Sequence, residues 1–186
     1  NAALVFAALS LNVLADLPRD AEKQDWPAVS AQISAKADIN TAQADGTTAL
    51  HWAAYHDKAD IVTQLLAAGA KADTANRYGV TPLLLACQNG SEEIVRSLLN
   101  AGADANVKQR GGETALMIAS RTGKPGAVKA LLEKGAKMNA QDRTGQTALM
   151  WAAAEGHAEV LELFIQKGAN VNHRLKSGFT ALLFAA

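Results

Sequence analysis

The feature that most constrains the fold of this chain is a set of landmarks that recurs every 33 residues. A threonine followed by Ala or Pro has this spacing, at Thr48, Thr81, Thr114, Thr147 and Thr180. A glycine stands two residues before each threonine, at Gly46, Gly79, Gly112, Gly145 and Gly178. A further glycine, always followed by Ala, recurs at Gly69, Gly102, Gly135 and Gly168. Three landmarks in phase over most of the chain predict a repeat array, in which each unit contacts only its neighbours.

Residues 143–172 show how one unit is predicted to fold. We expect Thr147 to cap a short helix, its hydroxyl accepting an early helix N–H, and Gly156 to end that helix in a left-handed conformation. Its apolar stripe is Leu149, Ala152 and Ala153. A second helix ends at Gly168 and has a wider apolar face, formed by Val160, Leu161, Leu163, Phe164 and Ile165. Two short antiparallel helices and an extended connection are marginal alone in water, so the unit needs neighbours.

The period and the order of elements resemble the ankyrin repeat, whose signature is T-P-L-H-x-A. The corresponding stretches here read TALHWA, TPLLLA, TALMIA, TALMWA and TALLFA. Only Pro82 and His51 keep the proline and the histidine of the signature. The resemblance implies an all-α solenoid of stacked helix-turn-helix units with short β-turn fingers. It also implies that His51 hydrogen-bonds the neighbouring loop and that His157 opens a second helix.

The register also predicts the domain organisation. Counted backward by 33 it reaches apolar residues, Leu17, Val29, Ile33 and Ala37. Residues 16–44 are therefore predicted to form a capping repeat with a polar outer face. The repeats that follow are expected at 45–77, 78–110, 111–143 and 144–176, with the start of a truncated repeat at 177–186. Because one helix there would leave an apolar side unpaired, we expect the natural protein to continue beyond Ala186.

Residues 1–15, NAALVFAALSLNVLA, carry no charge and lie outside the repeat register. They are similar to the later part of a secretory signal peptide, with an apolar run and a small-residue cleavage site ending at Ala15. The alternative is a hydrophobic helix that caps the solenoid. A membrane anchor fits less well, because a span needs about 20 apolar residues. We expect an exported protein, periplasmic or extracellular, and otherwise a cytoplasmic one.

Composition and motif spacing give no sign of a catalytic, metal or nucleic-acid-binding site. Lys+Arg and Asp+Glu are both 18, so the formal net charge is zero and nothing indicates a nucleic acid partner. Cys87 is the only cysteine, which excludes an intrachain disulfide, and we interpret it as a small buried residue. His51 and His56 are five apart, which does not place them on one helical face for a metal. No Ser/His/Asp set recurs within a repeat. We therefore expect no enzymatic activity, no cofactor and no metal.

The resemblance implies that partners bind through the turn tips and the exposed side of the first helix. Carried over by register, the candidate partner-binding residues are Asp45, Tyr55, His56, Arg77, Tyr78, Gln88, Arg110, Arg121, Arg143 and Lys176. Surface positions of this kind vary from repeat to repeat, as a heterogeneous binding face requires. The alternative is that they vary because solvent imposes little constraint.

Two further series share the 33-residue spacing. One is apolar, and we favour core packing over an aromatic binding stripe for it: Trp52, Leu85, Ile118, Trp151 and Phe184. The other is basic and predicts a row of positive charge along one edge: Arg77, Arg110, Arg143 and Lys176. That row either meets an acidic surface of a partner protein or is only a solvated edge.

These observations predict a non-enzymatic protein-binding scaffold that acts as a monomer. The alternative is an interaction arm of a larger enzyme or receptor whose active domain lies outside this sequence.

Overall fold

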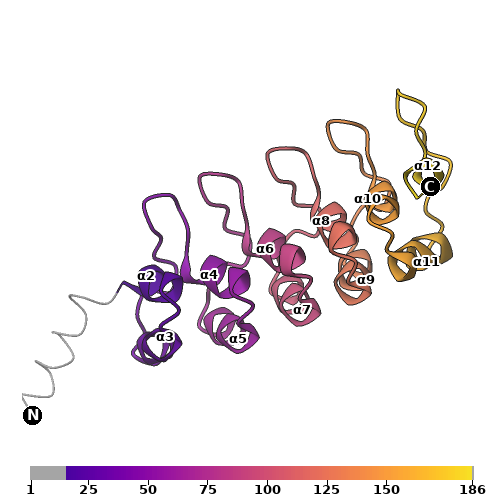
Figure 1. Cartoon of the computed structure of the whole chain (residues 1–186). Helices are drawn as coiled ribbons and strands as arrows, with labels where there is room; N and C mark the ends of the chain where they lie inside the picture. The colour runs from indigo at the N-terminus through magenta and orange to yellow at the C-terminus, as the bar shows by residue number, and fades with distance from the viewer. Residues whose placement is uncertain (1–15, 186) are drawn as a thin grey trace, which may run out of the picture.

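The computed structural model describes residues 16–185, which form eleven helices arranged as an elongated array (Figure 1). Residues 1–15, and with them the proposed signal peptide, lie outside this range. The helices lie in two rows, with the first and the last described helix at opposite ends of the array. This is the all-α solenoid that the resemblance implied.

Each repeat except the last contributes one helix to each row. The first helices are α2 (Leu17–Glu22), α4 (Ala49–Tyr55), α6 (Pro82–Asn89), α8 (Ala115–Thr122), α10 (Ala148–Ala154) and α12 (Ala181–Phe184). The second helices are α3 (Trp26–Ser34), α5 (Ala59–Ala67), α7 (Glu92–Asn100), α9 (Pro125–Glu133) and α11 (Ala158–Gln166). A helix packs against its pair within the repeat and against the equivalent helices of the adjacent repeats. Sequence-local contacts of this kind give a core that lengthens with each unit.

The threonine landmarks are N-caps, but not all of them cap with the side chain. The hydroxyls of Thr81 and Thr114 accept the backbone N–H of Leu84 and Met117, at 3.4 and 3.2 Å. The predicted bond of Thr147 is wrong. Its backbone has the extended N-cap conformation, yet its buried hydroxyl has no hydrogen-bond partner within residues 16–185. The backbone position sets the helix start, whereas the side-chain bond also needs one particular χ1 rotamer, which sequence does not specify.

The turn between the paired helices uses a left-handed residue, as predicted. Gly156 has a φ of 71°, and Asp57, which occupies the same position in an earlier repeat, has a φ of 55°. Aspartate tolerates this region better than most non-glycine residues, so the turn survives the substitution. The prolines also stand where they do no harm, because Pro82 and Pro125 are the first residues of α6 and α9.

Burial follows the register along the array. Leu17 and Val29 of the capping repeat are buried, and so is Cys87, whose burial raises the pKa of its thiol. The apolar face predicted for α11 included one residue too many. Val160 and Phe164 are buried, but the side chain of Ile165 is 59% exposed. A helix packed on one side covers a limited arc, and Ile165 lies at its solvent edge.

The extended connections between repeats form five fingers, which project from one side of the array (Figure 1). In each finger a backbone N–H donates to the carbonyl four residues later, at 2.8–3.0 Å, as from Asn76 to Val80. We number the fingers one to five in chain order, at residues 43–47, 76–80, 109–113, 142–146 and 175–179. At the base of the fingers, polar side chains accept a backbone N–H of the next repeat; they are Asn40, Asp73, Asn106 and Asn139.

Candidate protein-binding surface

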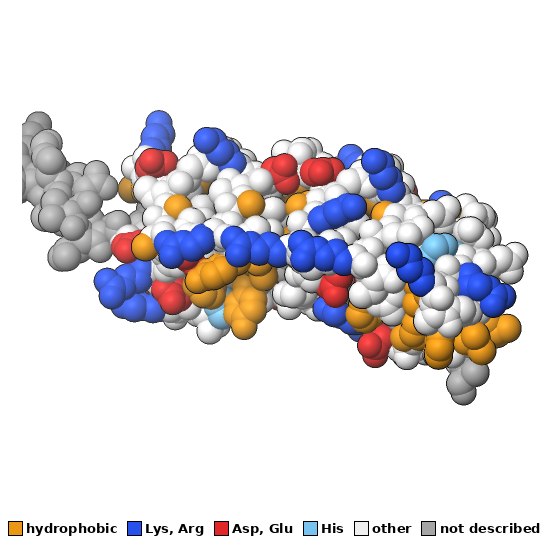
Figure 2. Space-filling model, turned by 90° about the horizontal axis from the view of Figure 1, so that it is seen from above, with side chains coloured by type: hydrophobic (Ala, Val, Ile, Leu, Met, Phe, Trp, Pro, Cys, Tyr) orange, Lys and Arg blue, Asp and Glu red, His pale blue; other side chains and the backbone are white. Residues whose placement is uncertain are grey.

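The basic row of the fingers is held in place by the backbone of the preceding finger. A guanidinium N–H of Arg77 donates to the carbonyl of Ala44, and one of Arg110 donates to the carbonyl of Arg77. Each arginine thus reaches back by one repeat, which lays its side chain along the axis of the array. Both residues remain exposed. Seen from above, Lys and Arg side chains follow one another along the array (Figure 2).

Arg143 and Lys176 continue the same register in fingers four and five, and both are exposed. The side chain of Arg143 lies against the third finger, because a Cβ added at Gly112 would be 3.2 Å from its Cγ. Neither residue forms an ion pair with any part of the chain between residues 16 and 185. Their positive charges therefore face solvent.

Asp45 and Tyr78 differ in what their side chains can offer a partner. The Asp45 carboxylate accepts the backbone N–H and the hydroxyl of Thr47, both at 2.9 Å. The backbone bond from Thr47 is the largest cause that lowers the pKa of this carboxyl. Asp45 is thus occupied in shaping the first finger. The ring of Tyr78, in contrast, is 55% exposed at the second finger.

A cluster of aromatic side chains lies between the capping repeat and the first full repeat. The ring centroid of His56 lies 5.0 Å from that of Tyr55, 5.9 Å from that of Trp26 and 6.0 Å from that of Trp52. Burial is the main cause that lowers the pKa of His56, and the nearby Lys58 adds to it. Tyr55 remains 52% exposed at the rim of the cluster. Tyr55 therefore presents an aromatic surface that its neighbours hold in one orientation.

The apolar series of the first helices packs in or against the core, as predicted, although most of its members are not fully buried. Ile118 is fully buried, whereas the other members are half-buried and pack against the core: Trp52, Leu85, Trp151 and Phe184. Trp and Phe rings extend beyond the small residues of neighbouring repeats, so one edge reaches the surface.

Gln88 and Arg121 complete the predicted first-helix positions. Gln88 is exposed on α6. Arg121 places its guanidinium carbon 5.4 Å from the ring centroid of Trp151, a cation–π arrangement, and lies 3.8 Å from the Glu113 carboxylate. The half-buried Trp151 thus supports the Arg121 side chain at the surface.

The two histidines assigned by resemblance have the roles that it implied. His51 Nε2 lies 3.1 Å from the carbonyl oxygen of Val80 in the second finger. Its Nδ1 lies 3.2 Å from the backbone nitrogen of Thr48. His157 caps α11, and its Nε2 lies 2.8 Å from the carbonyl oxygen of Arg121. Both side chains join adjacent repeats.

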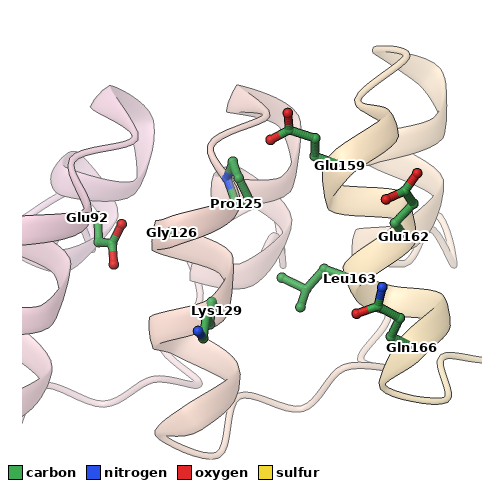
Figure 3. A pocket seen from close by; sticks show the side chains of 8 residues that line it. All are labelled: Glu92, Pro125, Gly126, Lys129, Glu159, Glu162, Leu163 and Gln166. Carbon is green, nitrogen blue, oxygen red and sulfur yellow. The ribbon is translucent and has the colours of Figure 1, made fainter.

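A shallow groove of about 390 Å³ lies on the opposite row, between α9 and α11 (Figure 3). Its wall includes Glu92, whose carboxylate occupies the space above Gly126, where an added Cβ would come within 1.8 Å of it. Glu92 also pairs with Arg96 at 2.8 Å, and Arg96 pairs with Glu133 at 2.9 Å. This groove lies outside the surface that the sequence indicated, and its chain of ion pairs links α7 to α9.

Within residues 16–185, no three His, Cys, Asp or Glu side chains gather as they would to hold a metal ion. No helix in the same range has the length and apolar character needed to cross a membrane.

The comparison with protein families agrees with the geometry. The family model described as ankyrin repeats (3 copies) matches residues 20–109, 58–142 and 116–186. No curated protein matches the chain. Ankyrin repeats are generally protein-interaction modules and are typically non-catalytic. Since the matched segments together span nearly all of the sequence, the chain belongs to the ankyrin repeat family.

Proposed function

We propose that this chain is a non-enzymatic protein-binding scaffold whose partner lies across the fingers and the exposed side of the first helices. The observation that carries this proposal is the arginine series. Arg77 and Arg110 are each fixed to the backbone of the preceding finger, so their positive charges hold defined positions along one edge. Fixed side chains lose less conformational entropy when a partner binds.

The chemistry of the surface favours an acidic partner with apolar contacts. Hydrophobic side chains are exposed beside the basic line over the first repeats (Figure 2). Tyr55 and Tyr78 are the large aromatic residues exposed there, at 52% and 55%. Tyrosine is enriched among residues that dominate binding energy, and aligned charges mainly accelerate association. We propose that the tyrosines supply most of the affinity and that the arginines steer the encounter.

A matched pair of variants tests this proposal. A partner is first recovered from the native host by cross-linking to the tagged full chain, then purified and measured by biolayer interferometry. Tyr78→Ala should weaken its binding by about tenfold, as loss of a hot-spot aromatic does. Ile165→Ala removes a similarly exposed apolar side chain from the other row and should leave affinity unchanged. Equal affinities for the two variants would contradict the assigned face.

We also propose that the protein is exported, on the basis of the uncharged apolar run in residues 1–15. N-terminal sequencing of the protein from its native host should then give a mature chain that begins at Asp16. A mature chain that retains residues 1–15 would contradict export by cleavage and would favour the capping helix.

A further inference from the structure

The gap between fingers four and five holds a cleft. The cleft has a volume of about 260 Å³. The polar residues that line it are Gln141, Asp142, Arg143, Thr144, His173, Arg174 and Lys176. Three of these seven carry a permanent positive charge, and only one carries a negative charge.

Two of the residues that line the cleft, His173 and Leu175, are held against the fourth finger. His173 Nε2 lies 2.9 Å from the carbonyl oxygen of Gly145, which ties the fifth finger to the fourth. Leu175 lies beside Gly145, where an added Cβ would be 3.4 Å from its Cδ2. The first four fingers have a polar residue at the position of Leu175, namely Gln43, Asn76, Gln109 and Asp142. The lining of the cleft therefore combines an apolar side chain with charged ones.

The one negative charge in the wall is hydrogen-bonded within its own finger. One carboxylate oxygen of Asp142 accepts the backbone N–H groups of Thr144 and Gln146, at 2.8 and 3.0 Å. The same oxygen accepts the hydroxyl of Thr144 at 2.6 Å. Asp142 is thus bound to its own finger, much as Asp45 is in the first finger.

The positive charges, in contrast, are free to act on a ligand. Arg77 and Arg110 donate to carbonyls of the preceding finger. Within residues 16–185, neither Arg143 nor Lys176 makes such a bond. Arg174 makes only a long one, 3.4 Å from Nη1 to the carbonyl oxygen of Gly178. Three exposed cations therefore surround the cleft with most of their donors unused.

We propose that this cleft binds an anionic group, a carboxylate or a phosphate, on an acidic segment of the partner protein. The planar guanidinium of an arginine can grip either group with two parallel N–H bonds, and lysine adds a compact point charge. The inference rests on the proposed function, since it assigns the cleft as the specific anchor point of the basic row. The rest of the row steers the partner towards it.

In the test, an octaglutamate peptide is titrated into the full chain at low ionic strength. Binding is monitored by the backbone amide chemical shifts of the protein in NMR spectra. The amides of Thr144, Gly145, Ser177 and Gly178 should shift most and should saturate, while Gly79 and Gly112 in fingers two and three report on diffuse binding. Arg143→Gln with Lys176→Gln should weaken the peptide by about tenfold. Arg77→Gln with Arg110→Gln removes equal charge from equivalent positions and should weaken the peptide clearly less, by about twofold, because only long-range attraction is lost. Retained amide shifts in α10 and α11 show that the repeats beside the cleft are folded, and those in α6 and α7 show the same for the repeats of Arg77 and Arg110.

Equal weakening by the two double variants, or uniform shifts in all fingers, would overturn the cleft and leave only a diffuse basic edge. Tighter binding of a peptide with one phosphoserine among neutral residues would identify phosphate as the anion, and tighter binding of octaglutamate would identify carboxylate. Either result supports the cleft. Preferential binding of octathymidylate would overturn the assignment to an acidic protein. If octaglutamate does not bind but Tyr78→Ala still weakens the native partner, this inference fails while the proposed function stands.

Discussion

The side chain of Asn106 joins its own repeat to the next one at two points. Its Oδ1 accepts the backbone N–H of Lys137 at 2.8 Å, and its Nδ2 donates to the carbonyl of Gly135 at 3.1 Å. Asn40, two periods earlier, makes the same pair of bonds to Lys71 and Gly69. The amide side chain both accepts and donates a hydrogen bond here. A carboxylate at this position can accept the first bond but cannot donate the second.

Asp73 occupies the same register position and makes only the first of these bonds. It accepts the backbone N–H of Asp104 at 3.3 Å and has no donor for the carbonyl of Gly102. We predict that Asp73→Asn raises the free energy of unfolding by about 0.5–1.5 kcal/mol, measured by urea denaturation, because it supplies that donor. Asn106→Asp should lower stability by a similar amount. The same sign of change for both variants would show that the second bond is not what matters.

Gly123 and Gly156 allow the cost of a clash to be separated from the cost of backbone strain. Both have a φ of 71°, so alanine at either position incurs about 1–2 kcal/mol for the left-handed conformation. A Cβ at Gly123 would lie 2.3–2.5 Å from the His157 ring, whereas nothing lies within 4 Å of one at Gly156. The ring cannot move without losing the bond between its Nε2 and the carbonyl of Arg121.

We therefore predict that Gly123→Ala destabilises the protein by about 1–3 kcal/mol more than Gly156→Ala does. Thermal unfolding followed by circular dichroism measures the difference. The interpretation of the His157 contact is wrong if both variants have the same unfolding temperature.

His51 should make stability depend on pH. Its Nδ1 faces the backbone N–H of Thr48, so this nitrogen accepts, and Nε2 is the atom that donates to Val80. A proton on Nδ1 would face the backbone N–H of Thr48, which is itself a donor, so protonation costs this hydrogen bond. Burial is the largest cause that lowers the pKa of His51 below 6.5. The unfolded chain then takes up a proton first as the pH falls. Stability is complete above the unfolded pKa of 6.5 and decreases as the pH drops below it.

The matched control for this pH dependence is His51→Met, because methionine stands at the same register position in Met117 and Met150. Urea denaturation between about pH 7 and 5 should show a smaller loss of stability for the variant than for the natural chain. A residual loss is expected from His56, whose pKa burial also lowers. An unchanged pH profile in His51→Met would remove His51 from this account.

The sequence predicted the register of the array because three landmarks repeat with one period, and each has a local physical role. Threonine starts a helix, and glycine ends one whatever its neighbours are. The same spacing contains the series Asn40, Asp73, Asn106 and Asn139, which could have been found by the same count. It was missed because its bonds go to the next repeat, and the partner of a side chain across an interface is not visible in a local pattern.

Exposure was the least predictable property. Ile165 lies one residue after the buried Phe164, and the packing of α11 against α9 and α10 decides which of the two faces solvent. Trp52 and Trp151 occupy the same register position as Ile118. Ile118 is buried, whereas the larger tryptophan rings reach the surface. Similarly, the sequence predicted a row of basic residues but not that Arg110 is held by the backbone of Arg77.

The anchoring of the arginines determines how the basic row must be tested. Replacing Arg77, Arg110 and Arg143 together by Gln removes three charges, but it also removes two bonds between fingers. The matching replacement of all three by Lys loses the guanidinium geometry and keeps the charges.

We predict that at low salt the Gln triple variant associates with the native partner about tenfold more slowly, whereas the Lys triple variant keeps the natural rate. Stopped-flow measurements at several salt concentrations resolve the two effects, because steering fades as the Debye length shortens. Slow association in both variants would mean that the finger geometry matters rather than the charge, and natural rates in both would reduce the row to a solvated edge.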